Sequence, residues 1–133
     1  MIEELYKASI AGVKIEMIVR GVCCLIPGVK NMSENIKVIS VVDKYLEHPR
    51  IYIFENAGKT KVYISSADWM TRNFENRIEV TCPIYDTDLQ NQIIDTFNIS
   101  WKDNVKSRLI NEFKLRNIRK QNIVKTRSQF ETY

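Results

Sequence analysis

Two periods of hydrophobic residues alternate along the first part of the chain. From Ile2 to Ile10 (IEELYKASI), apolar and aromatic side chains recur at nearly helical spacing, which predicts a helix. Gly12 follows as a stop signal. From Val13 to Val19 (VKIEMIV), apolar residues alternate with Lys or Glu, so this segment is predicted to be a strand.

Four further strands are expected before residue 85. Ile36–Val42 is rich in β-branched residues. Arg50–Glu55 and Lys61–Ser65 flank a short segment that contains Gly58, which is typical of a hairpin. Arg77–Cys82 (RIEVTC) forms the last predicted strand, and the proline after it is expected to end that strand.

The second half of the chain changes to a helical period. Four apolar residues share one face of a predicted helix: Leu89, Ile93, Ile94 and Phe97. Asp86 or Thr87 is available as its N-cap. Further helices are expected over Asp103–Phe113 and, more briefly, over Val42–Glu47. The pattern therefore predicts an α/β fold with a sheet of about five strands flanked by helices.

Composition is that of an ordinary globular domain: 133 residues, 44% of them hydrophobic and 27% charged. The amino-terminal residues lack the basic and then apolar pattern of a secretory signal. Cys23 and Cys24 are adjacent and Cys82 is distant, which suits neither a disulfide framework nor a zinc site. Buried, reduced thiols in a cytoplasmic protein are expected, with peripheral membrane association as an open alternative.

The net charge of +4 is unevenly distributed. Residues 100–133 contain nine Lys or Arg and three acidic residues, so they carry +6, and the preceding residues carry −2. We expect one domain over residues 1–115 and a basic tail over residues 116–133. Such a tail is typical either of an anion-binding arm or of a solvated surface, and charge alone does not separate the two.

Arg20 and His48 are the first candidates for chemistry. Arg20 directly follows a predicted strand and precedes Gly21, so its guanidinium would emerge at the strand end where ligands of open α/β sheets collect. A guanidinium suits phosphate oxygens, although a surface arginine in a loop has the same pattern. His48, the one histidine of the chain, precedes the predicted hairpin. An imidazole can transfer protons near neutral pH, but a lone histidine is also common as a structural or surface residue.

A polar cluster, Ser65-Ser66-Ala67-Asp68, follows the second hairpin strand. Its hydroxyls and backbone N–H groups could face an anion, while Asp68 could instead cap a helix. The next two residues, Trp69 and Met70, are expected to pack into the core. Further polar groups follow closely in the sequence: Arg72, Asn73 and Arg77.

These residues lie within longer segments that resemble a known family. His48, Arg50, Glu55 and the SSAD cluster are similar to a degenerate phospholipase D motif, HxK followed by an acid and then G-S-x-N. More specifically, IVRGVCCLIPG, VDKYLEHPRIYIFENAG and YISSADWMTRN closely resemble the C-terminal region of bacterial polyphosphate kinases. The similarity runs from Met1 to about Leu115.

The resemblance implies the last of that family's phospholipase D-like catalytic domains, in which a mixed sheet supplies half of a shared active site. It implies reversible transfer of the terminal phosphate of ATP to polyphosphate, through a phosphohistidine upstream of this chain and with Mg²⁺ held by upstream ligands. Arg20 falls on the family's ATP- and phosphate-binding arginine, and His48 on its second active-site histidine. Residues expected to line the phosphate site are Ser65, Ser66, Arg72 and Arg77.

The implied partners are ATP or ADP, polyphosphate and the remaining domains of the same enzyme, which is expected to be a homo-oligomer. No metal ligand is expected in the chain itself, and the chain alone is expected to be inactive. No specific nucleic-acid partner is expected under this interpretation. Two alternatives stay open. One is a non-catalytic module that binds polyanions, RNA or polyphosphate, through a basic tail from Lys106 to Arg127. The other is a phospholipase D-like phosphodiesterase that dimerises to pair two His48 residues.

Overall fold

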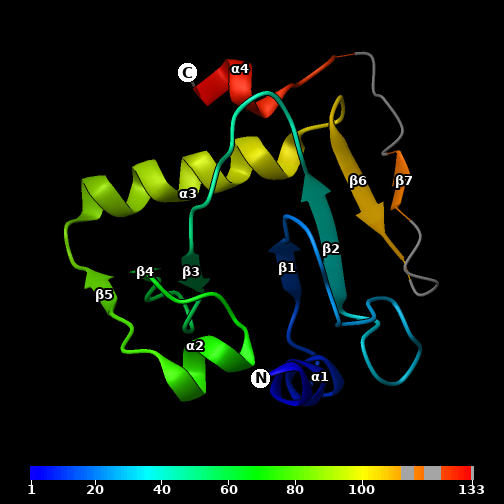
Figure 1. Cartoon of the computed structure of the whole chain (residues 1–133), viewed down its shortest axis with the longest axis vertical. Helices are drawn as coiled ribbons and strands as arrows, with labels where there is room; N and C mark the ends of the chain where they lie inside the picture. The colour runs from blue at the N-terminus through cyan, green and yellow to red at the C-terminus, as the bar shows by residue number, and fades with distance from the viewer. Residues whose placement is uncertain (112–115, 119–123, 133) are drawn as a thin grey trace. The chain divides into compact units, whose positions relative to one another are not determined.

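The computed structural model describes residues 1–111, 116–118 and 124–132, which form two compact units (Figure 1). Unit 1 comprises Met1–Leu46 and Ile99–Tyr133, and unit 2 comprises Glu47–Asn98. The chain passes from unit 2 back to unit 1 within one helix, α3 (Thr87–Lys102). The α/β class is confirmed. The division predicted at residue 115 stays a prediction, and the described residues beyond it include β7 (Arg116–Ile118) and α4 (Ser128–Thr132).

Unit 1 contains a mixed four-stranded sheet with the order β1-β2-β6-β7 (Figure 1). Strand β1 (Ile15–Ile18) runs parallel to β2 (Ile36–Val41), with Ile15 opposite Ile36. Strand β6 (Ser107–Ile110) is antiparallel to both β2 and β7. The mixed character that was expected is therefore present in this sheet.

The core of unit 1 lies on one face of that sheet, around Leu25, Ile36, Val38 and Ile110. Helix α1 (Ile2–Ile10) covers this cluster with its apolar stripe, because residues at helical spacing share one face. Three of its side chains pack against the core: Ile2, Leu5 and Tyr6. Burial of this apolar area is the main favourable term in folding of the unit.

Unit 2 is built on an antiparallel sheet with the order β3-β4-β5. Strands β3 (Ile51–Phe54) and β4 (Lys61–Ser65) form the predicted hairpin, with Tyr52 opposite Tyr63. Three successive residues of their connection have positive φ: Asn56, Ala57 and Gly58. Glycine and asparagine adopt this left-handed backbone readily, whereas alanine does so rarely. The unit also contains a short helix, α2 (Thr71–Asn76), that the sequence pattern did not predict.

Helix α3 begins where the sequence placed it. The carboxylate of Asp86 accepts a hydrogen bond from the backbone N–H of Leu89 at 3.0 Å, which confirms Asp86 as the N-cap. Within the described part of the chain, no helix has the length and apolar character needed to cross a membrane.

Three predicted elements are wrong. The expected single sheet of about five strands is two sheets, of four and three strands in the described residues. The helix expected over residues 103–113 is instead a turn followed by β6 as far as the described residues extend, to Asn111. Asp103 causes this change, because its Oδ1 accepts backbone N–H groups of the next turn and thereby stops α3. Residues 42–47 contain no helix.

The last strand of unit 2 lies further along the chain than predicted. Strand β5 spans Thr81–Ile84 and so contains Pro83. Proline lacks an N–H group, but β5 is an edge strand and needs hydrogen bonds on one side alone. Residues 77–80 precede it outside any strand, and Ile78 is fully exposed there.

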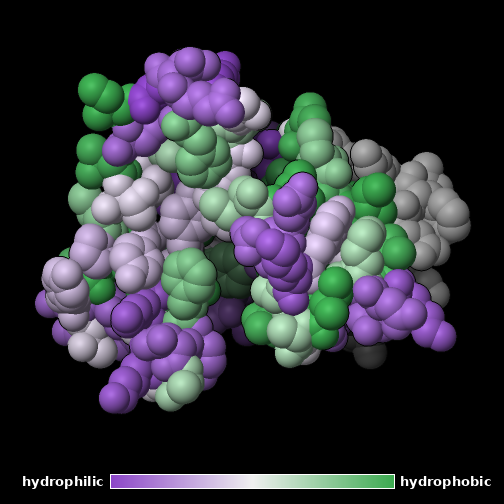
Figure 2. All heavy atoms as spheres, turned by 90° about the horizontal axis from the view of Figure 1, so that it is seen from below, coloured by the Kyte–Doolittle hydropathy of each residue, from purple (hydrophilic) through white to green (hydrophobic). Residues whose placement is uncertain are grey.

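Several apolar residues expected in the core are at the surface. Trp69 is 38% and Met70 46% exposed, although the Trp69 ring stacks on Tyr52 at 5.2 Å between ring centroids. Cys24 and Cys82 are exposed, so buried thiols are wrong for these two residues. Figure 2 shows hydrophobic residues beside hydrophilic ones on the face that it presents.

Candidate functional site

His48 lies in the segment that enters β3, and its neighbours explain its orientation. Pro49 disfavours helical backbone at His48 and favours an extended chain. The carbonyl of Arg50 accepts the Ser65 N–H at 2.9 Å, so hairpin pairing extends to Arg50 beyond the end of β3. In extended backbone, residues two apart point to the same side. His48 and Arg50 are therefore presented together.

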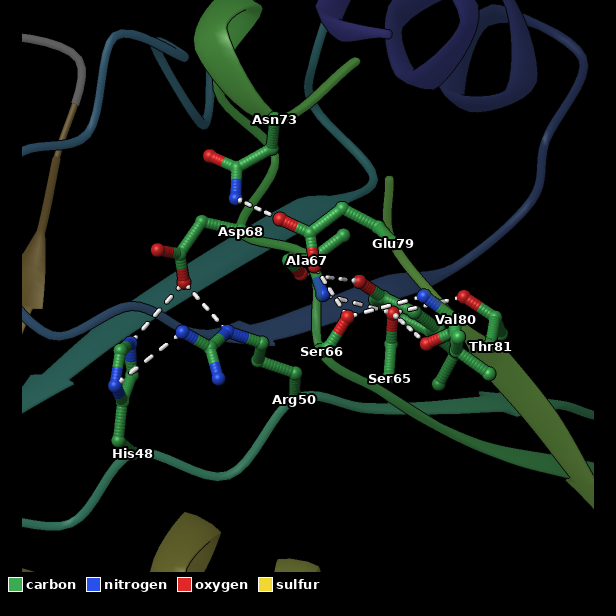
Figure 3. A network of polar contacts seen from close by, with 11 residues as sticks. His48, Arg50, Ser65, Ser66, Ala67, Asp68, Asn73, Glu79, Val80 and Thr81 are labelled. Atoms are coloured by element: carbon green, nitrogen blue, oxygen red, sulfur yellow. Dashed lines mark hydrogen bonds and ion pairs between the residues drawn. The ribbon is translucent and has the colours of Figure 1, made fainter. Parts of the chain in front are cut away.

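Both side chains converge on the carboxylate of Asp68, which follows β4 (Figure 3). Asp68 Oδ1 lies 3.1 Å from His48 Nε2 and 2.8 Å from Arg50 Nε. A third contact closes the cluster, since Arg50 Nη2 lies 3.4 Å from His48 Nδ1. We call these three residues the His48 cluster.

Asp68 and Arg50 stabilise one another in their charged forms. The hydrogen bond from Arg50 is the largest cause that lowers the pKa of Asp68; partial burial opposes it, and the His48 contact lowers the pKa further. The same hydrogen bond, which Arg50 donates to Asp68, raises the pKa of Arg50. Asp68 is therefore an ionised acceptor at neutral pH, and the half-exposed His48 ring lies on the solvent side of the cluster.

A second polar network lies next to the His48 cluster in unit 2 (Figure 3). The Ser66 hydroxyl donates to the Glu79 carboxylate and accepts the Val80 N–H at 3.0 Å. Buried Asn73, on α2, donates from Nδ2 to Glu79 Oε1 at 2.7 Å. The hydrogen bond from Ser66 is the largest cause that lowers the pKa of Glu79, and the hydrogen bond from Asn73 is the next largest. The charge of Arg77 lowers this pKa further.

Ser65 also has partners within the protein. Its hydroxyl lies 2.8 Å from the Thr81 hydroxyl, and it accepts the Ala67 N–H at 3.1 Å. Both predicted serines thus join the strand end of β4 to the segment before β5. An anion that bound these hydroxyls would have to compete with the bonds of this network.

The other predicted site residues are placed separately. Arg20 lies in unit 1, exposed, directly after Val19, whose N–H bonds to the Ile39 carbonyl at 2.8 Å and so continues the pairing of β1 with β2. Arg72 is exposed in the first turn of α2. Arg77 is exposed directly after α2.

The alternative role of Asp68 as a helix cap is wrong. Helix α2 has Met70 as its N-cap and no side-chain capping bond, and Asp68 instead binds His48 and Arg50. Sequence reasoning placed Arg50 and Asp68 in the degenerate phospholipase D-type motif but did not name them as site residues, and it did not name Asn73 or Glu79 either. The i, i+2 spacing of His48 and Arg50 before a strand was the available signal for the first of these.

Over residues 1–111, 116–118 and 124–132, no group of three or more His, Cys, Asp or Glu residues could hold a metal ion. The polar chemistry of the described site therefore consists of an imidazole, a guanidinium, carboxylates and hydroxyls.

Comparison with known proteins identifies relatives of the whole chain. Residues 1–129 match the family model "Polyphosphate kinase C-terminal domain 2". Over an alignment of 134 residues that covers all of this chain, it is 52% identical to a polyphosphate kinase of Vibrio parahaemolyticus and 50% identical to one of Klebsiella pneumoniae. The chain spans 19% and 20% of the length of these two relatives.

A solved structure is similarly close. The crystal structure of a polyphosphate kinase from Porphyromonas gingivalis matches with a TM-score of 0.95 and 46% sequence identity. The match covers 98% of this chain and 20% of that chain.

Proposed function

The chain belongs to the polyphosphate kinase C-terminal domain 2 family, and from this membership we propose that it is the C-terminal catalytic part of an ATP:polyphosphate phosphotransferase. The proposed reaction is reversible transfer of the terminal phosphate of ATP to polyphosphate. A phosphohistidine outside this chain carries the phosphate. One observation carries the proposal: the similarity to polyphosphate kinases extends over the full chain, at about half identical residues.

The geometry of unit 2 supports a phosphate-handling role. The His48 cluster puts an imidazole and a guanidinium side by side near solvent, and phosphoryl transfer depends mainly on such positioned charges. In the proposal, His48, Arg50 and the SSAD segment take the roles of the degenerate phospholipase D-type motif and form half of a shared site. His48 would act opposite the phosphohistidine.

Arg20 is the second phosphate-binding residue in the proposal. Its exposed guanidinium follows β1, and a planar donor fork of this kind binds phosphate oxygens of a nucleotide or of polyphosphate. Four further residues would line the phosphate path: Ser65, Ser66, Arg72 and Arg77. To bind phosphate, the two serine hydroxyls would have to replace the hydrogen bonds that they form within the protein. Mg²⁺ would be held by residues outside this chain.

The remaining domains of the same enzyme are the proposed partners, together with further copies in a homo-oligomer. Each unit has large apolar side chains that are strongly exposed and could contact other domains: Val22 and Leu46 in unit 1, and Ile78 and Tyr85 in unit 2. The alternative of a basic anion-binding tail has less support, because Arg127 binds the carboxylate of Asp43.

The test is a chimera. The corresponding C-terminal fifth of the Escherichia coli polyphosphate kinase, which is 48% identical to this chain, is replaced by the 133 residues. Polymer formation from radiolabelled ATP and Mg²⁺ is then measured. We expect synthesis that depends on both Arg20 and His48. A folded chimera whose upstream histidine is phosphorylated but which makes no polymer would contradict the proposal.

A further inference from the structure

The two neighbours of the His48 ring determine which of its nitrogens carries a proton. An ionised carboxylate can only accept a hydrogen bond, and a guanidinium can only donate one. Asp68 Oδ1 faces Nε2 at 3.1 Å, so Nε2 must donate. Arg50 Nη2 faces Nδ1 at 3.4 Å, so Nδ1 must accept.

The other protonation states fit the cluster poorly. An imidazole protonated on Nδ1 alone would turn a lone pair toward the carboxylate of Asp68 and a hydrogen toward Arg50. An imidazolium would keep the bond to Asp68 but point its Nδ1–H at the Arg50 donor. Unpaired or opposed polar groups of this kind are unfavourable. The neutral ring with its hydrogen on Nε2 satisfies both contacts.

The bonds of Arg50 and Asp68 also fix where this ring points. Arg50 Nε donates at 2.8 Å to the same Oδ1 that faces the ring, so the carboxylate orients both the guanidinium and the imidazole. The charges of Glu79 and Tyr52 also act on the cluster, through their effect on Arg50. The Nη2 contact to Nδ1 is the longest of the three and is the one that a ligand could replace most easily.

We propose that Asp68 is a positioning residue that holds His48 in the Nε2–H form, and that His48 consequently meets a phosphate ligand through Nδ1 as a proton acceptor. The first part stands on the geometry of unit 2 alone, whereas the second part rests on the proposed function. This proposal assigns His48 the role of proton acceptor, whereas the family resemblance placed it in the site without saying whether it donates or accepts a proton.

The proton balance of this step is simple. A hydroxyl of the terminal phosphate group loses its proton to the lone pair of Nδ1: the O–H bond breaks, the Nδ1–H bond forms, and the phosphate oxygen keeps the electron pair. The ring becomes an imidazolium, and Asp68 stabilises the new charge through Nε2–H. Ser-His-Asp enzymes use an aspartate in this way, with the two ring nitrogens exchanged. Arg50 Nη2 would turn from Nδ1 to the phosphate oxygen.

The single histidine makes the inference directly measurable. In the full 133-residue chain with ¹⁵N-labelled imidazole, long-range ¹H–¹⁵N spectra at about pH 8, where imidazoles are mostly neutral, report which nitrogen is protonated. We expect the Nε2–H form to predominate. In Asp68→Asn, whose amide can donate to Nε2, we expect a shift of population toward the Nδ1–H form, while Asp68→Glu keeps an acceptor and retains Nε2–H.

Asp88→Asn is the matched control, because it removes an exposed carboxylate of the same unit from the first turn of α3. We expect it to leave the ratio of the two ring forms unchanged. A predominant Nδ1–H form in the wild-type chain would overturn the proposal, and so would a wild-type ratio in folded Asp68→Asn. The wild-type spectrum decides by itself if the Asn variant does not fold.

Inorganic tripolyphosphate is the probe for the ligand part. We expect its addition to shift the Nδ1 resonance more than the Nε2 resonance, and Arg50→Ala to weaken this response. A response centred on Nε2 would overturn the proton-acceptor role of Nδ1 while leaving phosphate binding, and thus the proposed function, in place. A chain that shows the expected Nε2–H form but no response to tripolyphosphate at either nitrogen would overturn the ligand part and count against the proposed function.

Discussion

The carboxylate of Asp103 and the residue Ser128 are 25 positions apart and are joined by two hydrogen bonds. Asp103 Oδ2 accepts the Ser128 N–H at 2.8 Å and the Ser128 hydroxyl at 3.0 Å. The same side chain uses Oδ1 to accept the N–H groups of the turn before β6. Asp103 is fully buried, so one carboxylate both ends α3 and fastens the segment that leads into α4.

Asp103→Ala should therefore destabilise unit 1 strongly. The substitution leaves several backbone N–H groups without their acceptor, and an unsatisfied buried donor costs about 1–3 kcal/mol. We expect a loss on the order of 3 kcal/mol in the free energy of unfolding, measured by urea denaturation of the chain. Asp88→Ala, at an exposed carboxylate of α3, should change this free energy little. Equal stability of the two variants would contradict the assigned role of Asp103.

Acid should destabilise the same region. The hydrogen bond from Arg127 is the largest cause that lowers the pKa of Asp43. Burial alone would raise the pKa of Asp103. Hydrogen bonds from backbone N–H groups, of which the one from Ser128 is the largest, outweigh burial, so the pKa is lowered. Both carboxyls thus bind protons less readily in the folded chain than in the unfolded chain.

This stabilisation is complete above the ordinary aspartate range, near ~4, and is lost as the pH falls through the lower folded pKa values. We expect the free energy of unfolding to decrease steadily below about pH 4. Unfolding by urea at successive pH values measures this. Asp43→Asn should flatten part of the dependence, and an unchanged profile in that variant would show that Asp43 does not contribute.

Arg20→Ala should impair synthesis in the chimera with the E. coli enzyme without unfolding the protein, because Arg20 is exposed. Loss of one positioned charge at a transferring phosphate costs about two decades or more in rate. Steady-state polymer synthesis measures the effect, and Lys14→Ala, which removes another exposed cation of unit 1, is the control. Unchanged kinetics in a folded Arg20 variant would remove this residue from the site.

His48→Gln should separate the two halves of the reaction in the same chimera. Loss of a proton acceptor lowers turnover by roughly two to four decades. The upstream histidine should still accept phosphate from ATP, so acid-labile label on the protein should persist while chain growth fails. Label trapped on His48 of the unsubstituted chimera, with none upstream, would reverse the roles given to the two histidines.

The 133-residue chain alone should be catalytically silent. Transfer through a covalent intermediate needs a nucleophile held in line with the donor, and one histidine cannot serve both sides of the phosphate. Incubation of the chain with Mg²⁺ and radiolabelled ATP should give neither protein-bound phosphate nor polymer, whereas the chimera serves as the positive control. Stoichiometric label on the isolated chain would show that it contains a complete site.

Local patterns were sufficient for much of the fold. Four features depend on residues that are close in sequence: the amphipathic period of α1, the β-branched composition of β2, the hairpin of β3 and β4, and the capping of α3 by Asp86. Their side chains face a core or solvent according to simple periodicity, and the structure confirms these elements. The motifs that contain Arg20 and His48 were also sufficient to recognise the family.

Contacts between distant residues decided the rest. Residues 107–110 form β6 rather than a helix because they pair with β2. Asp103 forms the turn before β6 through local contacts of Oδ1, but its Oδ2 binds a residue as distant as Ser128. Asp68 reaches His48 and Arg50 only after the hairpin has brought its two ends together. A one-dimensional pattern cannot predict such partners, because an aspartate suits a helix cap and a distant cation equally well until folding places one of them within hydrogen-bond distance.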